Sequence, residues 1–297
     1  MPSLVLDNTE LSLVVDPLGA SILAFDARLP GGSGRVPLMP DVRSGDTGLT
    51  AASFLMVPYS NRIAHGAFRF DGSVIQLPEA AKHAIHGEVR RRPWQVVETT
   101  PTTARLRFVS GQHTGIGWPW AFTSEVAYTL DGPTLTMALA VQNASDRPMP
   151  GGLGFHPYFV REAGVRIQAG FTGIYPDREI PCIPSGPAEP PEPARDLSTE
   201  RDLDPGQFMD FCAAGWDGRA TITWPGRGLR LRFVASPELG HLVVYNPDKP
   251  WFAVEPVSHA NDGVNLLARS EPGSGLRVLA PGETLTARVG LSLERWG

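Results

Sequence analysis

The segment Leu229-Arg-Leu-Arg-Phe233 alternates apolar and charged side chains at every position. A period of two places the leucines and the phenylalanine on one face of an extended chain and the arginines on the other. The same period runs through Thr134–Gln142, in which every second residue is apolar and large. We therefore predict half-buried strands at Leu229–Val234 and Thr134–Gln142, whose apolar faces pack on a common core.

Other short β-rich runs recur along the chain of 297 residues, with turn signals such as Asp71-Gly72 and Pro281-Gly282 between them. The modest helix candidates are Thr50–Leu55 and Val264–Arg269. Many short strands with little helix are typical of a sandwich or barrel, so we predict an all-β fold, a large antiparallel β-sandwich. The other predicted strands are Leu11–Val15, Ser21–Phe25, Ala67–Phe70, Trp94–Glu98, Ala104–Val109, Phe122–Leu130, Val165–Ala169, Ala220–Trp224, Leu242–Tyr245, Ala253–Val257 and Thr284–Leu293.

Composition and charge exclude several classes of protein. Hydrophobic residues make up 42% of the chain and charged residues 19%, which fits a folded protein and not a disordered one. The net charge is -5, and the only run of three basic residues is Arg90, Arg91 and Arg92, which is too short for a nucleic-acid surface. The sequence has no stretch of about 18 apolar residues that could span a membrane. We expect neither a nucleic acid nor a membrane as a partner.

The cellular compartment follows from two further observations. The N-terminus lacks a basic segment followed by an apolar core, so it does not resemble a secretory signal. The two cysteines, Cys182 and Cys212, are too few for a disulfide framework and lack the spacing of a metal site. We therefore expect a cytoplasmic protein.

Residues 181–206 are rich in proline and then in charge. Prolines stiffen and expose a chain, so this segment could be an interdomain linker or a long surface loop within one domain. We favour the loop, and a single domain over residues 1–297, because candidate polar residues lie on both sides of the segment and must meet in one site.

The run Gly152-Leu-Gly-Phe-His-Pro-Tyr-Phe159 places one imidazole in an apolar environment. Pro157 fixes its own φ and favours an extended His156, so backbone and neighbouring rings together set the direction of the imidazole. An imidazole titrates near neutral pH, and proton-transfer catalysis requires such a group in a fixed direction. A lone histidine is more often a buried residue satisfied by a hydrogen bond, so polar residues elsewhere in the chain decide its role.

Three further polar clusters interrupt the apolar strands. Asn61 and Arg62 precede a strand and would place donors at a sheet rim; a surface arginine and a turn-capping asparagine are the alternative. His83 and His86 would share a face on a helix, but the flanking turn residues predict a loop, and the following glycine lets a ligand approach the backbone. Glu255 is a charge inside an apolar strand, and because burying an unpaired carboxylate is costly, it has either a structural salt bridge or a chemical task.

Several kinds of catalytic site are disfavoured by spacing. The histidines that could form a metal site with Glu255 are His83, His86, His156, His241 and His259. No pair of them shows the spacing of a strand or helix metal site. No serine lies in a Gly-x-Ser-x-Gly turn, and the glycines at 151–154 precede an extended segment where a phosphate loop would precede a helix.

What remains is a histidine acid paired with a carboxylate base, His156 with Glu255, and no metal or other cofactor. Arginine, asparagine and aspartate side chains would bind sugar hydroxyls, and aromatic faces would contact sugar C–H groups. The tryptophans that could offer such faces are Trp94, Trp118, Trp120 and Trp216.

Five motifs taken in order point to a known family. They are Asn61-Arg-Ile63 with Gly66 and Phe68, His86-Gly87 with Trp94, Gly154-Phe-His-Pro-Tyr-Phe159, Phe208-Met-Asp210 with Gly215-Trp-Asp-Gly218, and Val254-Glu-Pro256. This ordered set resembles the aldose 1-epimerase (galactose mutarotase) family, and the resemblance covers the chain from about residue 10 to its end.

The resemblance implies a β-supersandwich and a role for each site residue. Glu255 would be the general base that takes the proton of the anomeric hydroxyl, and His156 the general acid that protonates the ring oxygen. His86 would hold the ring oxygen and the anomeric region, while Arg62 and Asp210 would bind hydroxyls. Ring opening, rotation about the C1–C2 bond and closure would then give the other anomer, so the chain would be an isomerase of carbohydrate metabolism.

The segment after His86-Gly87 departs from the pattern of the galactose-converting members, because the arginines at 90–92 follow it. Recognition of a carboxylate or phosphate is one interpretation, and solvated surface charge is the other. The alternatives to a mutarotase of a free sugar are therefore an enzyme for a phosphorylated, deoxy or acidic sugar, and a non-catalytic sugar-binding protein. We expect a monomer or a homodimer.

Overall fold

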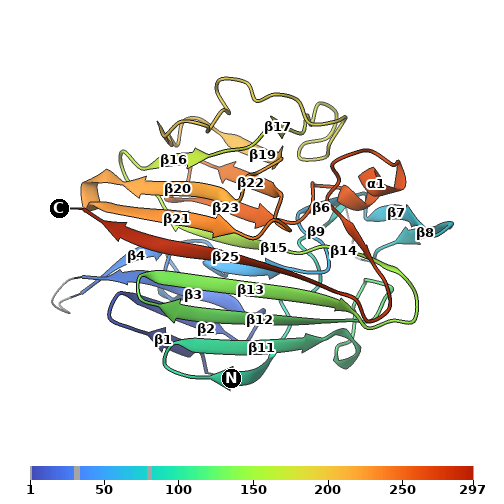
Figure 1. Ribbon diagram of the computed structural model, residues 1–297, viewed down its shortest axis with the longest axis horizontal. Coiled ribbons are helices and arrows are strands. Elements are labelled where there is room, and N and C mark those ends of the chain that lie inside the picture. The colour runs from blue at the N-terminus through green and yellow to red at the C-terminus, as the bar shows by residue number, and fades with distance from the viewer. Residues whose placement is uncertain (1, 30–33, 79–81, 297) are drawn as a thin grey trace.

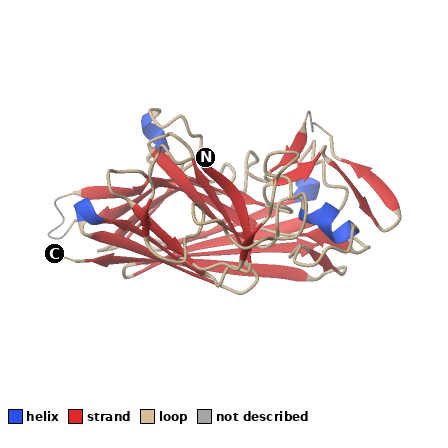
Figure 2. Cartoon of the chain, turned by 90° about the horizontal axis from the view of Figure 1, so that it is seen from above, coloured by secondary structure: helices blue, strands red, loops and turns tan. Residues whose placement is uncertain are grey.

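The computed structural model describes residues 2–29, 34–78 and 82–296, and about half of this chain is in strands (Figures 1 and 2). Two large antiparallel sheets dominate the structure, which confirms the predicted all-β architecture. Within the described residues, no helix is both long and apolar enough to cross a membrane.

The first large sheet has ten strands. Its edge strand β4 (Arg35–Met39) pairs with β3 off the main path. In order across the sheet, the other strands are β1 (Leu4–Asp7), β2 (Leu11–Asp16), β3 (Ser21–Arg28), β5 (Ser53–Met56), β15 (Gly154–Val160), β23 (Trp251–Val257), β22 (His241–Asn246), β19 (Met209–Ala214) and β17 (Gly173–Ile174).

The second large sheet has nine strands, and consecutive hairpins build half of it. In order across the sheet, they are β10 (Gln95–Thr99), β11 (Thr103–Val109), β12 (Phe122–Asp131), β13 (Thr134–Asn143), β25 (Thr284–Arg295), β21 (Leu229–Ala235), β20 (Arg219–Trp224), β16 (Arg166–Ala169) and β18 (Arg201–Asp202).

The small elements gather at one end of the molecule in Figure 1, where β6, β7, β8, β9 and the helix α1 lie together. Three pairs of strands form small sheets: β6 (Arg62–Ala64) with β9 (His83–Ile85), β7 (Ala67–Phe70) with β8 (Ser73–Gln76), and β14 (Met149–Gly151) with β24 (Arg277–Leu279). The helix α1 spans Gly263–Ala268, and short 3-10 turns lie at Val42–Ser44, Ser110–Gln112 and Pro225–Arg227.

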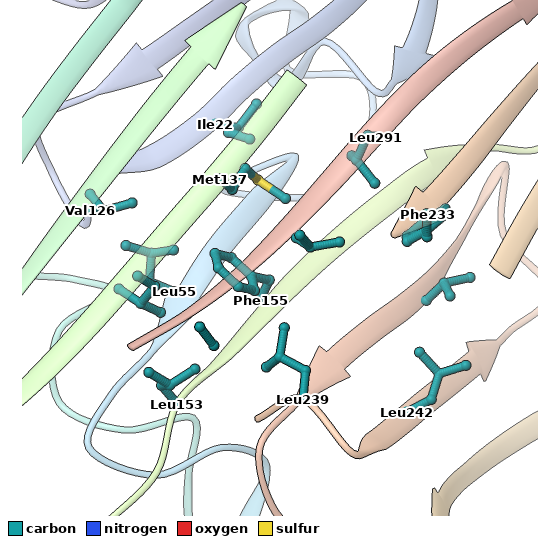
Figure 3. Close-up of a cluster of buried hydrophobic side chains, with 14 of the residues drawn as sticks. Ile22, Leu55, Val126, Met137, Leu153, Phe155, Phe233, Leu239, Leu242 and Leu291 are labelled. Carbon is teal, nitrogen blue, oxygen red and sulfur yellow. The ribbon is translucent and has the colours of Figure 1, made fainter. Parts of the chain in front are cut away.

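The main core lies between the two large sheets (Figure 3). The ten-stranded sheet contributes side chains such as Leu55 and Phe155, and the nine-stranded sheet contributes others such as Met137 and Leu291. Successive side chains of a strand point to opposite faces. Because Phe155 points into this core, the residue after it, His156, points to the outer face of the ten-stranded sheet.

That outer face is itself covered. A second, smaller hydrophobic cluster contains Phe54 and Met56 of β5, Val257 of β23 and Leu266 of α1. Loops and the end of the molecule that carries α1 therefore bury the outer face of the central strands. A polar group placed there is removed from water, which is the condition for a strongly shifted pKa.

Two local predictions have different outcomes. The helix candidate Val264–Arg269 corresponds to α1, whereas the candidate Thr50–Leu55 is wrong, because Ser53–Met56 is strand β5. All four residues of β5 are buried, so the strand shows no alternation of apolar and polar residues. Periodicity alone does not separate such a strand from a buried helix.

The proline-rich segment at 181–206 lies against the ten-stranded sheet. Glu189 and Ile174 of β17 exchange two backbone hydrogen bonds, at 2.8 and 2.9 Å. Cys182 and Ile183, near the start of the segment, are buried, while Glu179 and Pro190 beside them are exposed. The segment thus forms part of the cover over the outer face.

Candidate active site

His156 and Glu255 meet on the outer face of the ten-stranded sheet. Strands β15 and β23 are antiparallel, with Tyr158 opposite Ala253, so the residues two positions away on each strand also become neighbours. The His156 Nε2 atom lies 3.1 Å from Glu255 Oε1. Both side chains are almost fully buried, with 6% and 2% of their surface exposed. The sequence prediction of a histidine–carboxylate pair thus corresponds to a direct contact.

Burial changes the proton affinity of both partners. It raises the pKa of Glu255 well above its ordinary value; the charge of Asp210 raises it further and that of Arg62 opposes the rise. Burial lowers the pKa of His156 to about 3. A carboxyl that resists ionisation beside an imidazole that resists protonation favours the uncharged pair, in which the carboxyl keeps its proton. Transfer of that proton to the imidazole would turn the two groups into an ion pair.

His86 lies beside this pair in a strained backbone conformation. It follows strand β9, has φ of 65°, and donates its N–H to the carbonyl of Asn61 at 2.7 Å. Its ring meets that of His156 edge to face, with 5.1 Å between centroids. Burial lowers the pKa of His86 well below its ordinary value, and the proximity of His156 adds to the effect. Non-glycine residues in left-handed conformations cost energy and are concentrated at functional sites.

The neighbours of His86 correct one sequence prediction. His83, Ala84 and Ile85 form strand β9 where a loop is predicted, and His83 Nδ1 accepts a hydrogen bond from the His65 N–H at 3.1 Å. Gly87 has φ of 68°, and a Cβ there would lie 2.2 Å from the carbonyl oxygen of Val57. The glycine therefore permits a close approach of the chain's own backbone, and the predicted approach of a ligand stays a prediction.

Asn61 and Arg62 are held beside His86 by strand pairing. Arg62 begins β6 and lies opposite Ile85 of β9. Asn61 is buried with φ of 48°, and its Oδ1 accepts a hydrogen bond from Arg62 Nη1 at 3.4 Å. The charge of Arg62 acts on both Glu255 and Asp210. These residues, predicted to lie at a sheet rim, thus share one site with the buried carboxylates.

Asp210 lies on β19 opposite Tyr245 of β22. Burial raises its pKa, while a hydrogen bond from Cys182 and the charge of Arg62 oppose that rise. Cys182 Sγ donates to Asp210 Oδ2 at 3.0 Å, and burial raises the pKa of this thiol to about 12, so the thiol keeps its proton. Cys182 and Cys212 are both free thiols. Sequence reasoning missed the contact because it joins a loop residue to a strand residue with no local pattern.

The aromatic side chains beside the pair differ from the predicted ones. Phe54 stacks on His156 with 4.3 Å between ring centroids, and Tyr158 lies at 4.6 Å. Trp251 continues this row, 4.9 Å from Tyr158. The four tryptophans predicted to face the sugar belong to the main hydrophobic core and are 1% to 5% exposed: Trp94, Trp118, Trp120 and Trp216. Large rings are driven into the core, and composition alone does not show which rings remain at a site.

The three consecutive arginines have different surroundings. Arg92 donates to the carbonyl oxygens of Glu88, Thr114 and Gly115 at 2.9, 2.6 and 2.5 Å, so it fixes the loops around it. Arg91 is exposed to solvent. Neither of these two side chains is shown in contact with the histidine–carboxylate pair.

Arg90 differs from its two neighbours because it is half-buried at the site. Its guanidinium carbon lies 5.4 Å from the ring centroid of Phe54, the same ring that stacks on His156. Burial lowers the pKa of Arg90, and the charge of Arg91 lowers it further. Within the described residues, no carboxylate forms an ion pair with it. A cavity of about 450 Å³, lined in part by Gly87 and Arg90, lies beside it.

The site contains nitrogen and oxygen atoms that could in principle bind a metal ion. In residues 2–29, 34–78 and 82–296, no group of three or more histidine, cysteine, aspartate or glutamate side chains is arranged to hold one. His241 and His259, candidates by residue type, are engaged elsewhere: His241 Nε2 lies 2.9 Å from the carbonyl of Gly273, and His259 Nε2 accepts the Ser60 N–H at 3.0 Å.

Comparisons with known sequences agree with this geometry. A family model described as aldose 1-epimerase matches residues 2–292. The uncharacterized protein YphB of Escherichia coli K12 is 29% identical over 269 residues, 87% of this chain and 89% of YphB. The uncharacterized protein YihR of the same organism is 38% identical over 109 residues, 35% of this chain and 34% of YihR.

Solved structures share the architecture. A protein from Escherichia coli K12, provisionally named an aldose 1-epimerase, has a TM-score of 0.85 at 26% identity over 99% of both chains. The GalM/aldose epimerase homologue of C. elegans has a TM-score of 0.82 at 16% identity, covering 100% of this chain and 99% of its own. A galactose mutarotase-like protein from Lactobacillus casei has a TM-score of 0.80 at 16% identity over 99% and 100%. The latter two likenesses are to the fold alone.

The ordered motifs, the paired large sheets and the family model thus agree over nearly the whole length of the sequence. The chain belongs to the aldose 1-epimerase family.

Proposed function

We propose that this chain is an aldose 1-epimerase that interconverts the α and β anomers of a free aldose. The observation that carries the proposal is the 3.1 Å contact between His156 Nε2 and Glu255 Oε1 in a buried site. The anomeric oxygen and the ring oxygen of a cyclic aldose are bonded to the same carbon, so they are close together. A proton donor and a proton acceptor in mutual contact can therefore reach both oxygens of one sugar.

In the proposed reaction, Glu255 accepts the proton of the anomeric hydroxyl while His156 donates a proton to the ring oxygen. The bond between C1 and the ring oxygen breaks, C1 becomes an aldehyde, and the C1–C2 bond rotates. The same two groups then run the steps in reverse and close the ring to the other anomer. Only protons move, and the enzyme ends in the protonation state in which it began. Each positioned acid or base of this kind contributes roughly 10²–10⁴-fold in rate.

The pKa shifts bear on where the proton of the pair lies before and after ring opening. Opening transfers a proton from His156 to Glu255 by way of the sugar, which leaves a neutral imidazole and a neutral carboxyl. Burial favours those two forms, because it lowers the pKa of His156 to about 3 and raises that of Glu255. The ion pair that begins the step is therefore the less favoured arrangement, so a proton must first pass from Glu255 to His156, and ring opening then returns both groups to their uncharged forms.

The other predicted residues surround the pair at suitable places for binding. His86 is packed edge to face against His156, which suits a group that holds the ring oxygen and anomeric region. Arg62, Asn61 and Asp210 supply donors and acceptors for hydroxyl groups, and Phe54 and Tyr158 supply apolar ring faces. This combination of convergent polar groups and aromatic walls is typical of a small-molecule site.

Polarimetry of freshly dissolved α-aldoses tests the proposal. With the protein added, we expect mutarotation of at least one neutral aldose in a panel to accelerate in proportion to protein concentration. Tight sugar binding without any acceleration across the panel would contradict catalysis and favour a sugar-binding protein.

A second candidate, an epimerase for an anionic aldose, is favoured by Arg90. This half-buried guanidinium has no carboxylate ion pair within the described chain and lies against the ring that stacks on His156. Charged groups are costly to bury without a partner, and guanidinium groups bind carboxylates and phosphates well. The test adds a hexuronate and a hexose phosphate to the panel. A higher kcat/KM for either, lost in Arg90→Gln while the neutral aldose is unaffected, supports it; an unchanged ranking refutes it.

A further inference from the structure

A buried segment, residues 258–262, continues directly from the strand that carries Glu255. All of its residues are 4% exposed or less. We call it the anchor segment. Its backbone and side chains contact the chain at both ends of the candidate sugar site, although none of its members belongs to the predicted site.

Asp262 holds the strand that presents Arg62. Its N–H donates to the carbonyl of Arg62 at 2.7 Å, and its Oδ1 accepts the N–H of Ala64 at 2.9 Å. These two bonds flank Ile63, on the edge of β6 that is not paired with β9. Asp262 therefore acts as a one-residue strand partner. It does so in a left-handed conformation, with φ of 55°, and Asn265 Nδ2 donates to the same Oδ1 at 2.8 Å.

Asn261 holds the loop that reaches Asp210. Its Nδ2 donates to the carbonyl of Cys182 at 3.0 Å. Cys182 in turn donates its thiol proton to Asp210 Oδ2 at 3.0 Å. Cys182 also has a left-handed backbone, with φ of 62°, so its position depends on such external bonds. A chain of two hydrogen bonds thus joins Asn261 to Asp210.

The start of the anchor segment holds the chain just before β15, the strand that carries His156. Ser258 Oγ accepts the N–H of Leu153, just before β15. His259 Nε2 accepts the N–H of Ser60, next to Asn61, at 3.0 Å, and its Nδ1 lies 2.7 Å from the carbonyl of Ala260. The imidazole can satisfy both contacts only as the neutral form with its proton on Nδ1. His259 is therefore a structural group and not a second acid.

We propose that Asp262 and Asn261 are positioning residues that set the separation of Arg62 and Asp210. The proposal rests on the proposed function, in which Arg62 and Asp210 bind sugar hydroxyls. The Asp262 carboxylate accepts from Ala64 and Asn265, and the Asn261 amide donates to Cys182, so each acts on the site through these neighbours. Two adjacent residues thereby hold two sugar-binding residues that come from distant parts of the sequence. Both are held in fixed positions relative to β23, the strand that carries Glu255. Preorganisation of this kind reduces the entropy lost when a ligand binds.

Kinetics can separate the two arms of the proposal, which are Asp262 acting on Arg62 and Asn261 acting on Asp210. Asp262→Ala removes the bond between Oδ1 and the Ala64 N–H and keeps the main-chain bond to the Arg62 carbonyl, and it should raise KM roughly tenfold through Arg62. Asn261→Ala should do so through Asp210, and kcat should change less than about threefold in both variants. Asp262→Asn keeps an oxygen at Oδ1 and tolerates the left-handed conformation, so it should restore most of the affinity. A matched control is Asn143→Ala, at the end of β13 in the nine-stranded sheet, which removes a fully buried side chain that donates to the carbonyls of Arg147 and Leu279.

Double-mutant cycles give the decisive readout. If Asp262 acts through Arg62, adding Asp262→Ala to Arg62→Ala changes KM little further, whereas adding Asn261→Ala to Arg62→Ala multiplies the two effects. The reciprocal pattern is expected with Asp210→Ala. Full multiplication within each arm, or KM changes no larger than that of Asn143→Ala, would overturn the proposal.

Crystal structures of the two single variants test the same claim without any sugar. We expect Arg62 to move in Asp262→Ala while Asp210 stays in place, and the opposite in Asn261→Ala. If Arg62 and Asp210 keep their positions in both variants, the positioning role is overturned, even if the chain is active. Failure to turn over any aldose would overturn the proposed function. The crystal structures of the two variants would then still decide whether Asp262 and Asn261 are positioning residues.

Discussion

The outer faces of the two large sheets differ in what covers them. Along β13 of the nine-stranded sheet, buried and half-exposed residues alternate over the whole strand, so its outer face meets solvent. Along β23 of the ten-stranded sheet, all seven residues are buried. The second face is packed beneath loops, α1 and the small hydrophobic cluster.

The cover over the ten-stranded sheet explains why the buried His156–Glu255 pair lies on that sheet and not on the other. On the solvated face, charges pair across strands at the surface, as Arg232 and Glu294 do at 2.5 Å with about half of each side chain exposed. On the covered face, a histidine and a glutamate lie in contact but away from water, and their pKa values are strongly shifted. A sheet supplies rigid spacing on both faces, and the cover supplies the low-polarity environment that only one of them has.

The largest expected effect comes from breaking the covered pair. His156→Ala and Glu255→Gln should each lower kcat by roughly 10²–10⁴-fold, because each removes a proton-transfer group. Since the two groups act on one substrate as a unit, the double variant should be little worse than either single one. Steady-state anomer interconversion at saturating sugar measures this, with circular dichroism as the control for folding. Fully multiplicative losses would show that the two groups act independently.

The core between the sheets should give the next largest effect. Phe155 is fully buried beside His156 but points to the opposite face. Phe155→Ala should lower the free energy of unfolding by about 3–5 kcal/mol, as expected for removing a buried ring, and Phe155→Leu by less. Urea denaturation measures the loss. A loss below about 1 kcal/mol would mean that the two sheets do not depend on this contact.

The covered face should also give stability a characteristic pH dependence. Glu255 has a folded pKa raised above its ordinary 4.5, so its contribution is present below pH 4.5 and is lost as pH rises toward the folded value. His156 has the opposite sign: its pKa falls from 6.5 to about 3, so its contribution is present above pH 6.5 and is lost as pH falls toward 3.

Glu255→Gln should therefore gain stability relative to the wild type as pH rises above 4.5, by at most about 1.4 kcal/mol per pH unit. Denaturant unfolding of both proteins across the pH range measures the difference. A constant difference would contradict the raised pKa.

The smallest effect is expected on the solvated face. Arg232→Ala breaks an exposed ion pair with Glu294 on the nine-stranded sheet. The free energy of unfolding should change by no more than about 0.5 kcal/mol, and turnover should stay at the wild-type level. A tenfold loss of turnover would mean that the solvated face also takes part in function, and the contrast between the faces would fail.

The same contrast explains how much of the fold could be predicted. On the nine-stranded sheet, alternation predicts strands almost to their ends: Thr134–Gln142 is observed as Thr134–Asn143, and Leu229–Val234 as Leu229–Ala235. On the ten-stranded sheet, β5 is buried on both faces and was predicted as a helix. Alternation reports solvent on one face, so it disappears where both faces are covered.

The candidate site was predictable in part. His156 and Glu255 stand out because polar groups inside apolar strands require an explanation, whereas Asp210 is found only through the family resemblance. The structure places all three on one face. Cys182, Asn261 and Asp262 could not be found in this way. They lie in loops and act through contacts with residues far away in the sequence, such as the bond from Asp262 to β6. Local patterns carry no information about such pairings.

NMR saturation transfer between the anomeric protons of a free aldose tests directly whether the protein interconverts anomers and whether Glu255 is required. We predict that the wild-type protein transfers saturation from the α to the β anomer at catalytic concentrations, and that Glu255→Gln, folded to the same extent, does not. The proposed epimerase activity would be contradicted if the wild type caused no exchange in any aldose of the panel. The proposed role of Glu255 would be contradicted if exchange persisted at the wild-type rate without the Glu255 carboxylate.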